Sequence, residues 1–217
     1  MESLLQILKR PLSKDLLPFL APPKAWLLFL FFISFFAFTA KAQNLYPGVY
    51  LSEKNFRNNK ISFAPVKGER YKLRLNELLN LPTMKIKIGD SVFFLHKDSI
   101  YGYRDKESII HRFYHQTDYT MLNPGEEILL YKTITFGGYK NTQQVVNYFF
   151  SISDSSPILS LTKWNLMNAC RNDPAFLDLL DLTFKGDENL AVYDTYYKMY
   201  RINHLYRESH QIQFKSE

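Results

Sequence analysis

Hydrophobic residues are most continuous near the start of the chain, over residues 25–40. Basic side chains precede this run, and Ala40 and Ala42 follow with the small-x-small spacing of a signal-peptidase site. A helix of this length would measure about 24 Å, which is shorter than the roughly 30 Å hydrocarbon core of a bilayer. We therefore expect a signal peptide with an n-region over residues 1–24, an h-region over residues 25–40, and cleavage between Ala42 and Gln43.

The same segment allows a second interpretation, in which it is retained as a signal anchor. The region before the hydrophobic run is long, and Lys41 follows the run as a charged flank would. No cysteine lies near the predicted cleavage site, which excludes a lipoprotein anchor.

From residue 43 to residue 160, hydrophobic and polar positions alternate with the period of two that is typical of β-strands. The two clearest hairpins join residues 85–88 to 92–96 through a Gly-Asp turn, and residues 128–136 to 145–153 through a polar loop. Shorter strands are predicted over residues 48–51, 61–64, 70–75, 99–103, 109–114 and 119–122. This order predicts an antiparallel β-meander sheet of six to nine strands.

Residues 161–208 change to the helical period. Thr162 predicts the start of one helix as an N-cap, and Asp173 followed by Pro174 predicts the start of a second. A third helix is predicted over residues 188–206, and residues 209–217 are expected to form a loose tail. Strands followed by helices indicate an α+β fold, with three C-terminal α-helices packed on the sheet in the same domain.

The third predicted helix is rich in tyrosine. Tyr193, Tyr197 and Tyr200 would lie on one stripe at helical spacing. Such a stripe normally packs a helix against a sheet. Its alternative use is an aromatic surface that stacks on sugar rings, and both uses stay open at this point.

Composition matters most once the signal peptide is set aside. The full chain of 217 residues has a formal net charge of +6, but residues 1–42 hold five basic and two acidic side chains, which leaves the remainder near +3. Basic and acidic residues are interleaved along this remainder, as in residues 104–107, without a basic stripe of the kind that follows phosphates. We therefore expect no nucleic-acid partner. The single cysteine, Cys170, excludes an intramolecular disulfide and is expected to be buried on a helix.

Motifs of known catalytic chemistry are absent. The sequence has no nucleophile elbow, Walker A loop, dinucleotide fingerprint, zincin helix or EF-hand loop. The nearest approach to a metal site is the spacing of His111, His115 and Asp118, for which His96 or Asp98 would have to supply a fourth ligand. Because these histidines are expected at the surface near a turn, we predict no metal site. Since the catalytic and cofactor-binding motifs are also absent, we predict no cofactor and no catalytic residue.

Several short segments of the chain together carry a family resemblance. These segments are residues 48–51 with 55–56, 98–104, 112–114, 156–158, 161–162 and 200–203, together with a signal that ends at residues 41–43. They resemble a group of small exported proteins found in Bacteroidota-type bacteria. That group has no assigned activity, so the resemblance implies a Gram-negative envelope location and transfers no functional residue.

These features together predict an exported protein of the periplasm or the cell surface of a Gram-negative bacterium. We expect a non-enzymatic binding or structural domain whose partner is an envelope protein or a glycan. It would meet the membrane transiently, through its signal segment, unless that segment is uncleaved. Two alternatives are a small envelope hydrolase acting on glycan or peptidoglycan, and an inner-membrane accessory protein held by its signal anchor.

Overall fold

The computed structural model describes residues 46–75, 81–137 and 143–215. The predicted signal peptide, with its cleavage site at Ala40, Ala42 and Gln43, lies outside these residues. Residues Leu45–Glu217 form one compact unit. Within the described ranges, no helix has the length and the apolar character needed to cross a membrane.

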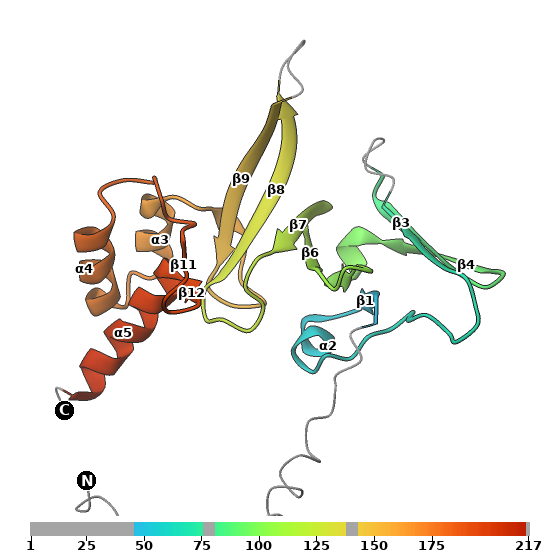
Figure 1. Cartoon of the computed structure of the whole chain (residues 1–217), viewed down its shortest axis with the longest axis horizontal. Helices are drawn as coiled ribbons and strands as arrows, with labels where there is room; N and C mark the ends of the chain where they lie inside the picture. The colour runs from blue at the N-terminus through green and yellow to red at the C-terminus, as the bar shows by residue number, and fades with distance from the viewer. Residues whose placement is uncertain (1–45, 76–80, 138–142, 216–217) are drawn as a thin grey trace, which may run out of the picture. The chain divides into compact units, whose positions relative to one another are not determined.

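A seven-stranded antiparallel sheet is the largest element of this unit (Figure 1). In spatial order its strands are β1 (Gly48–Tyr50), β5 (Gly102–Arg104), β6 (Ile110–Tyr114), β7 (Thr117–Met121), β8 (Leu129–Gly137), β9 (Gln143–Ser151) and β10 (Leu159–Ser160). Strands β5 to β10 follow chain order as a meander, and β1 completes the sheet beside β5. The predicted antiparallel meander and α+β class are therefore confirmed.

A second sheet has three strands, β2 (Tyr71–Arg74), β3 (Thr83–Ile88) and β4 (Ser91–His96). Strands β3 and β4 are the predicted hairpin, which turns at Gly89 with a φ of 57°. One face of this sheet is apolar, because Met84 and Ile86 are fully buried there. They pack with Val49 and other residues of the large sheet, so one hydrophobic cluster joins the two sheets.

The short elements at the start of the described chain follow the sequence with two corrections. Helix α2 (Glu53–Arg57) begins where Ser52 accepts a hydrogen bond from the Asn55 N–H at 3.2 Å. The strand predicted over residues 61–64 is reduced to an isolated bridge between Val49 and Ser62. The strand predicted over residues 99–103 begins later, because Ser99 donates a hydrogen bond to the His96 carbonyl and closes a 3₁₀ turn, η4 (Lys97–Ser99).

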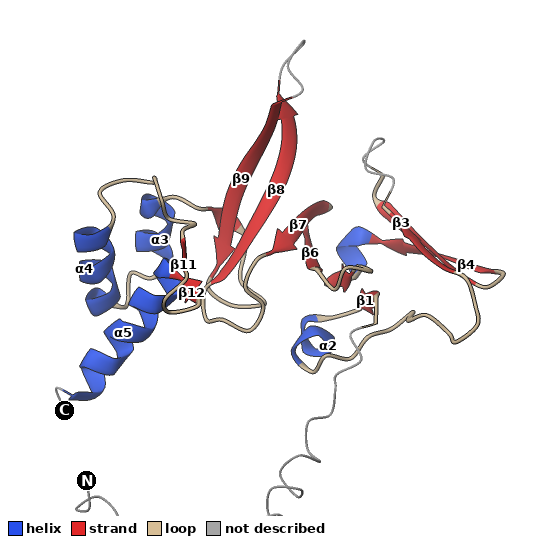
Figure 2. Ribbon diagram, viewed as in Figure 1, coloured by secondary structure: helices blue, strands red, loops and turns tan. Residues whose placement is uncertain are grey.

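Three helices pack against the end of the large sheet that carries β8 to β10 (Figure 2). They are α3 (Lys163–Ala169), α4 (Pro174–Thr183) and α5 (Arg201–Lys215). The predicted N-caps are confirmed, since Thr162 and Asp173 each accept a backbone hydrogen bond at 3.1 Å in the first turn. Phe176 and Leu180 of α4 are fully buried in the cluster that α3, α4 and α5 form with the sheet, and the Phe176 ring meets the ring of Tyr206 on α5.

The helix predicted over residues 188–206 is wrong in its first two thirds. The chain there forms a hairpin of β11 (Tyr193–Asp194) and β12 (Met199–Tyr200), and α5 begins at Arg201. Asp194 explains the difference, because its carboxylate accepts the backbone N–H groups of Tyr196 and Tyr197 and so favours a turn over a helix. The predicted loose tail is also wrong, since α5 continues to Lys215.

A buried asparagine joins α5 to the sheet. The Asn203 side chain accepts the Ile128 N–H and donates to the Ile128 carbonyl, both at 2.9 Å. Asn203 is fully buried, and Asn123 donates a further hydrogen bond to the same carbonyl at 2.8 Å. These contacts satisfy a backbone N–H and C=O at the start of β8 and fix the position of the β11–β12 hairpin immediately before α5.

Asn203→Ala should therefore destabilise the protein by about 2–4 kcal/mol, because it removes two buried hydrogen bonds and leaves the Ile128 N–H without a partner. Asn168→Ala, on the exposed face of α3, is the matched control and should change stability little. The measurement is the free energy of unfolding in urea. Equal stabilities for the two variants would show that Asn203 does not anchor α5.

Candidate functional site

The β11–β12 hairpin places four tyrosines at the surface, Tyr193, Tyr196, Tyr197 and Tyr200, which we call the tyrosine hairpin. Tyr193 pairs with Tyr200 across the two strands. Between them, Asp194 accepts hydrogen bonds from the N–H groups of Tyr196 at 2.8 Å and Tyr197 at 3.1 Å. The turn is thus held by its own side chain, which fixes the backbone that carries the rings.

Ring contacts fix the tyrosines further, yet leave much of their surface exposed. The Tyr197 ring stacks on His204 of α5 with centroids 3.7 Å apart, and Tyr193 meets Tyr200 edge to face at 5.3 Å. Tyr196 is 84% exposed, and Tyr193 and Tyr197 are about half exposed. Rigid, exposed aromatic rings are suited to binding because little conformational freedom is lost when a ligand covers them.

A shallow cavity of about 260 Å³ adjoins the hairpin. Its lining includes Tyr148 of β9, Asp187 and Asn189, together with the segment that ends at Val192, immediately before the hairpin. Burial raises the pKa of Tyr200, and the nearby phenol of Tyr148 and carboxylate of Glu126 add to this effect. The cavity lining combines the aromatic residue Tyr148 with Asp187 and Asn189, whose carboxylate and amide can exchange hydrogen bonds with hydroxyl groups.

Two of the three predicted metal-ligand residues come together, and the third does not. His111 Nδ1 lies 3.1 Å from an Asp118 oxygen, and its Nε2 lies 3.4 Å from Asp105. His115 is exposed at the turn between β6 and β7, where it and Gln116 both have positive φ, as in a type I′ hairpin. Among the residues that the structure describes, no group of three or more His, Cys, Asp or Glu side chains is arranged to hold a metal.

The surroundings of His111 indicate a structural role. Each ring nitrogen faces a carboxylate, and the ring stacks on Tyr103, whose hydroxyl donates to Asp118 at 2.7 Å. Burial by itself lowers the pKa of His111, but the hydrogen bonds and charges of Asp118 and Asp105 outweigh it, so the net effect raises the pKa. Both ring nitrogens of His111 therefore face carboxylates that hold the ring in place between β5 and β7.

The remaining fourth-ligand candidates have structural roles as well. Asp98 accepts hydrogen bonds from the Gln116 backbone at 3.1 Å and from its side-chain amide at 2.9 Å, which holds the β6–β7 turn. His96 lies 3.7 Å from Asp98 at the surface. Asp98 thus supports a turn and does not complete a site with His111.

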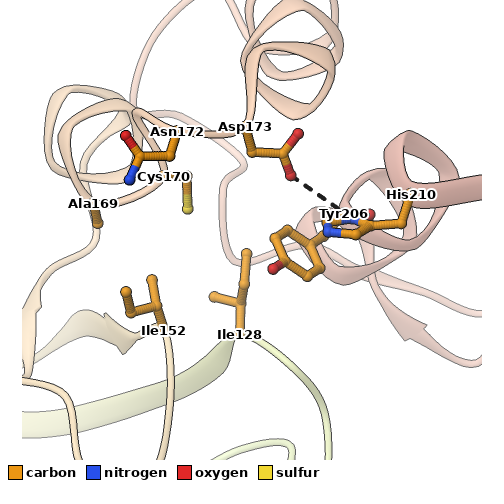
Figure 3. Close-up of a pocket in the computed structure, with 8 residues that line it drawn as sticks. All are labelled: Ile128, Ile152, Ala169, Cys170, Asn172, Asp173, Tyr206 and His210. Atoms are coloured by element: carbon orange, nitrogen blue, oxygen red, sulfur yellow. Dashed lines mark hydrogen bonds and ion pairs between the residues drawn. The ribbon is translucent and has the colours of Figure 1, made fainter. Parts of the chain in front are cut away.

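A cavity of about 280 Å³, lined by the end of α3, the loop between α3 and α4, and α5, brings together a cysteine, a histidine and an aspartate (Figure 3). His210 Nδ1 lies 3.7 Å from Asp173 and 2.8 Å from the Tyr206 carbonyl. Figure 3 shows Cys170 and His210 set apart across the cavity, with the Tyr206 ring on the His210 side. Burial, with a smaller effect of the Asp173 charge, raises the pKa of the Cys170 thiol to about 11.

This cavity does not provide an activated nucleophile. Reactive cysteines have a lowered pKa, usually from a helix N-terminus or a neighbouring cation. Cys170 is instead the C-cap of α3, where the helix dipole disfavours a thiolate, and it is buried as the sequence predicted. The hydrolase alternative gains no support from this cluster.

Sequence reasoning missed several residues of the candidate site. Tyr196 is the most exposed tyrosine of the hairpin, but it is not one of the three tyrosines of the predicted stripe. Tyr148, Asp187 and Asn189 come from other segments and join the site through the fold alone. The dipeptide Tyr196-Tyr197, two residues after an aspartate, is the local signal that could have indicated an aromatic turn.

Comparisons with known proteins give no further assignment. No protein-family model, curated protein or solved structure matches this chain. The functional inference therefore rests on the residues of the chain itself.

The pKa of His111 should lie above 6.5 in the folded protein, and Asp118→Asn should lower it. Since the folded-state pKa is raised, the ion pair stabilises the protein fully below pH 6.5 and is lost as the pH rises through the folded-state value. Titration of the imidazole by NMR measures the pKa. Asp90→Asn, at an exposed turn, is the control, and a His111 pKa that Asp118→Asn leaves unchanged would contradict the assigned ion pair.

Proposed function

We propose that this chain is an exported, non-enzymatic domain of the cell envelope that binds glycan through the tyrosine hairpin. The observation that carries the proposal is the exposure of Tyr196, Tyr193 and Tyr197 on a backbone turn that Asp194 fixes. Exposed aromatic patches on a folded surface usually mark binding sites.

The chemistry of the neighbouring groups favours a carbohydrate. One face of a sugar ring is made of C–H groups and packs on aromatic rings, while its hydroxyls need hydrogen-bonding groups at the edge. The cavity beside the hairpin provides such groups in Asp187, Asn189 and the phenol of Tyr148. Peptidoglycan and surface polysaccharides are the glycans that an envelope protein would meet.

Tyr196→Ala and Tyr193→Ala should each weaken glycan binding by roughly 2- to 12-fold, because each removes one aromatic contact of about 0.5–1.5 kcal/mol. The measurement is co-sedimentation of residues 45–217 with purified peptidoglycan sacculi and with insoluble surface polysaccharide. Tyr46→Ala removes a tyrosine that is 54% exposed outside the hairpin, so it is the matched control. Equal binding by all three variants, or no binding by the unchanged protein, would exclude the tyrosine hairpin as a glycan site.

The export part of the proposal depends on the N-terminal segment. Expression of the full chain in a Gram-negative host, followed by cell fractionation and intact-mass measurement, should give a soluble envelope protein that begins at Gln43. A full-length product in the inner membrane would instead support the signal-anchored alternative.

A further inference from the structure

The β2–β3–β4 sheet gathers cations on the face opposite its buried side. Strand register places Lys72 opposite Lys87 and Arg74 opposite Lys85, and β4 adds Val92 and Phe94 on the same face. We call these six residues the basic face. Lys72, Arg74 and Lys87 are exposed, and Lys85 is half-buried. The prediction that basic residues are interleaved with acidic ones holds along the chain but fails on this face.

The charges of the basic face lack neutralising partners within the described residues. Like charges directly opposite each other destabilise an antiparallel pair, and here two such pairs are adjacent. None of the four cations lies within 4.0 Å of a described carboxylate. The opposite face of the sheet is occupied by the hydrophobic core, so a partner of the cations must approach from the solvent side.

Apolar side chains share this face with the cations. Phe94 is 64% exposed and Val92 is 43% exposed. Lys85 Nζ lies 5.4 Å from the centre of the Phe94 ring, so charge and aromatic surface are in contact. Within the described strands β4 pairs with β3 alone, which leaves these apolar groups at an edge of the sheet. A partner therefore has to offer anions over an area and an apolar layer beside them.

We propose that the basic face binds the surface of an anionic phospholipid bilayer. Adjacent strands lie roughly 4.8 Å apart and alternate residues about 6.6 Å apart, so the four cations form a small grid that can meet several headgroup phosphates. Phe94 and Val92 then enter the boundary between headgroups and acyl chains, as apolar residues of peripheral membrane proteins do. A soluble polyanion would use the cations but would leave Phe94 in water.

This membrane contact is independent of the proposed glycan site. The basic face rests on the cluster built around Met84 and Ile86, whereas the tyrosine hairpin rests on the cluster that joins α3, α4 and α5 to the large sheet. Loss of one surface should leave the other intact, and the two proposals can fail separately.

The decisive variant is the double substitution Lys72→Glu with Lys85→Glu. It places a carboxylate opposite Lys87 and another opposite Arg74, which converts both like-charge pairs into attractive ones. The melting temperature of the variant should therefore equal or exceed that of the unchanged protein. Its basic face then carries two positive and two negative charges. Lys54→Glu with Lys60→Glu makes the same change in net charge at exposed positions elsewhere.

The experiment is flotation of residues 45–217 with vesicles of phosphatidylglycerol and of phosphatidylcholine. This range forms a compact unit with its own core and excludes the N-terminal hydrophobic segment. The unchanged protein should bind phosphatidylglycerol vesicles and not phosphatidylcholine vesicles. Lys72→Glu with Lys85→Glu should weaken binding by roughly tenfold or more, the Lys54 and Lys60 control far less, and Phe94→Ala severalfold.

Three outcomes would overturn the proposal. The unchanged protein could fail to bind phosphatidylglycerol vesicles, or both charge-reversal variants could lose binding equally. In the third outcome, Phe94→Ala leaves vesicle binding unchanged and a soluble polyphosphate binds the protein as well as the vesicles do. The basic face would then be a site for soluble polyanions. Co-sedimentation with sacculi should be unaffected by Lys72→Glu with Lys85→Glu, and this result separates the membrane contact from the glycan site.

Discussion

One buried guanidinium holds the middle of the large sheet together. Arg112 of β6 donates hydrogen bonds to the Tyr131 hydroxyl at 3.0 Å, to Ser151 Oγ at 3.3 Å and to the Ser156 carbonyl at 2.8 Å. Its charge also lies over the rings of Tyr101, Tyr114 and Tyr131 at 5.3 to 5.9 Å. These groups offset the loss of hydration of a cation that is only 5% exposed. Because the contacts reach across β7 to β8 and β9, they fix the position of β6 relative to both strands.

This fixed sheet supports two surfaces of opposite character. At the β10 end, the helices and the tyrosine hairpin are held through a cluster that includes Leu130 of β8 and Phe150 of β9. At the β1 end, the small sheet is held through Val49, Tyr103 and Phe113. Each surface exposes side chains that the cores do not need: aromatic rings on one, and cations beside apolar groups on the other. The two surfaces therefore rest on separate hydrophobic clusters of one domain.

The features that sequence predicted well are those set by local pattern. Alternation identified the long β8–β9 pair and the β3–β4 hairpin, and the caps Thr162 and Asp173 located the first residues of two helices. The third helix failed because the spacing of Tyr193, Tyr197 and Tyr200 fits a helical stripe, while the carboxylate of Asp194 stabilises a turn at the same place. A side-chain hydrogen bond to the backbone outweighed periodicity there.

Features that depend on which strands pair, and in which register, could not be predicted from the sequence. The basic face arises from two alternating segments, residues 72–74 and 85–87, whose charges become neighbours when their register is known. His111 and Asp118 were considered, together with His115, as the nearest approach to a metal site, but Asp105 and the stacked ring of Tyr103 come from the adjacent strand and its turn. The cavity beside the tyrosine hairpin likewise combines segments that lie far apart in the sequence.

The asparagine that joins α5 to β8 also sets the order in which the domain can be assembled. Neighbouring hairpins of the meander close short loops, and such local contacts form quickly. Ile128 and Asn203 are separated by 75 positions, so their hydrogen bonds close a long loop and require nearly the whole chain to have been synthesised. A chain that stopped before Asn203 would contain both larger sheets but would lack the anchor that positions the tyrosine hairpin. Proteolysis that removes Asn203 would therefore release the tyrosine hairpin from its anchor on β8, while the two larger sheets keep all of their strands.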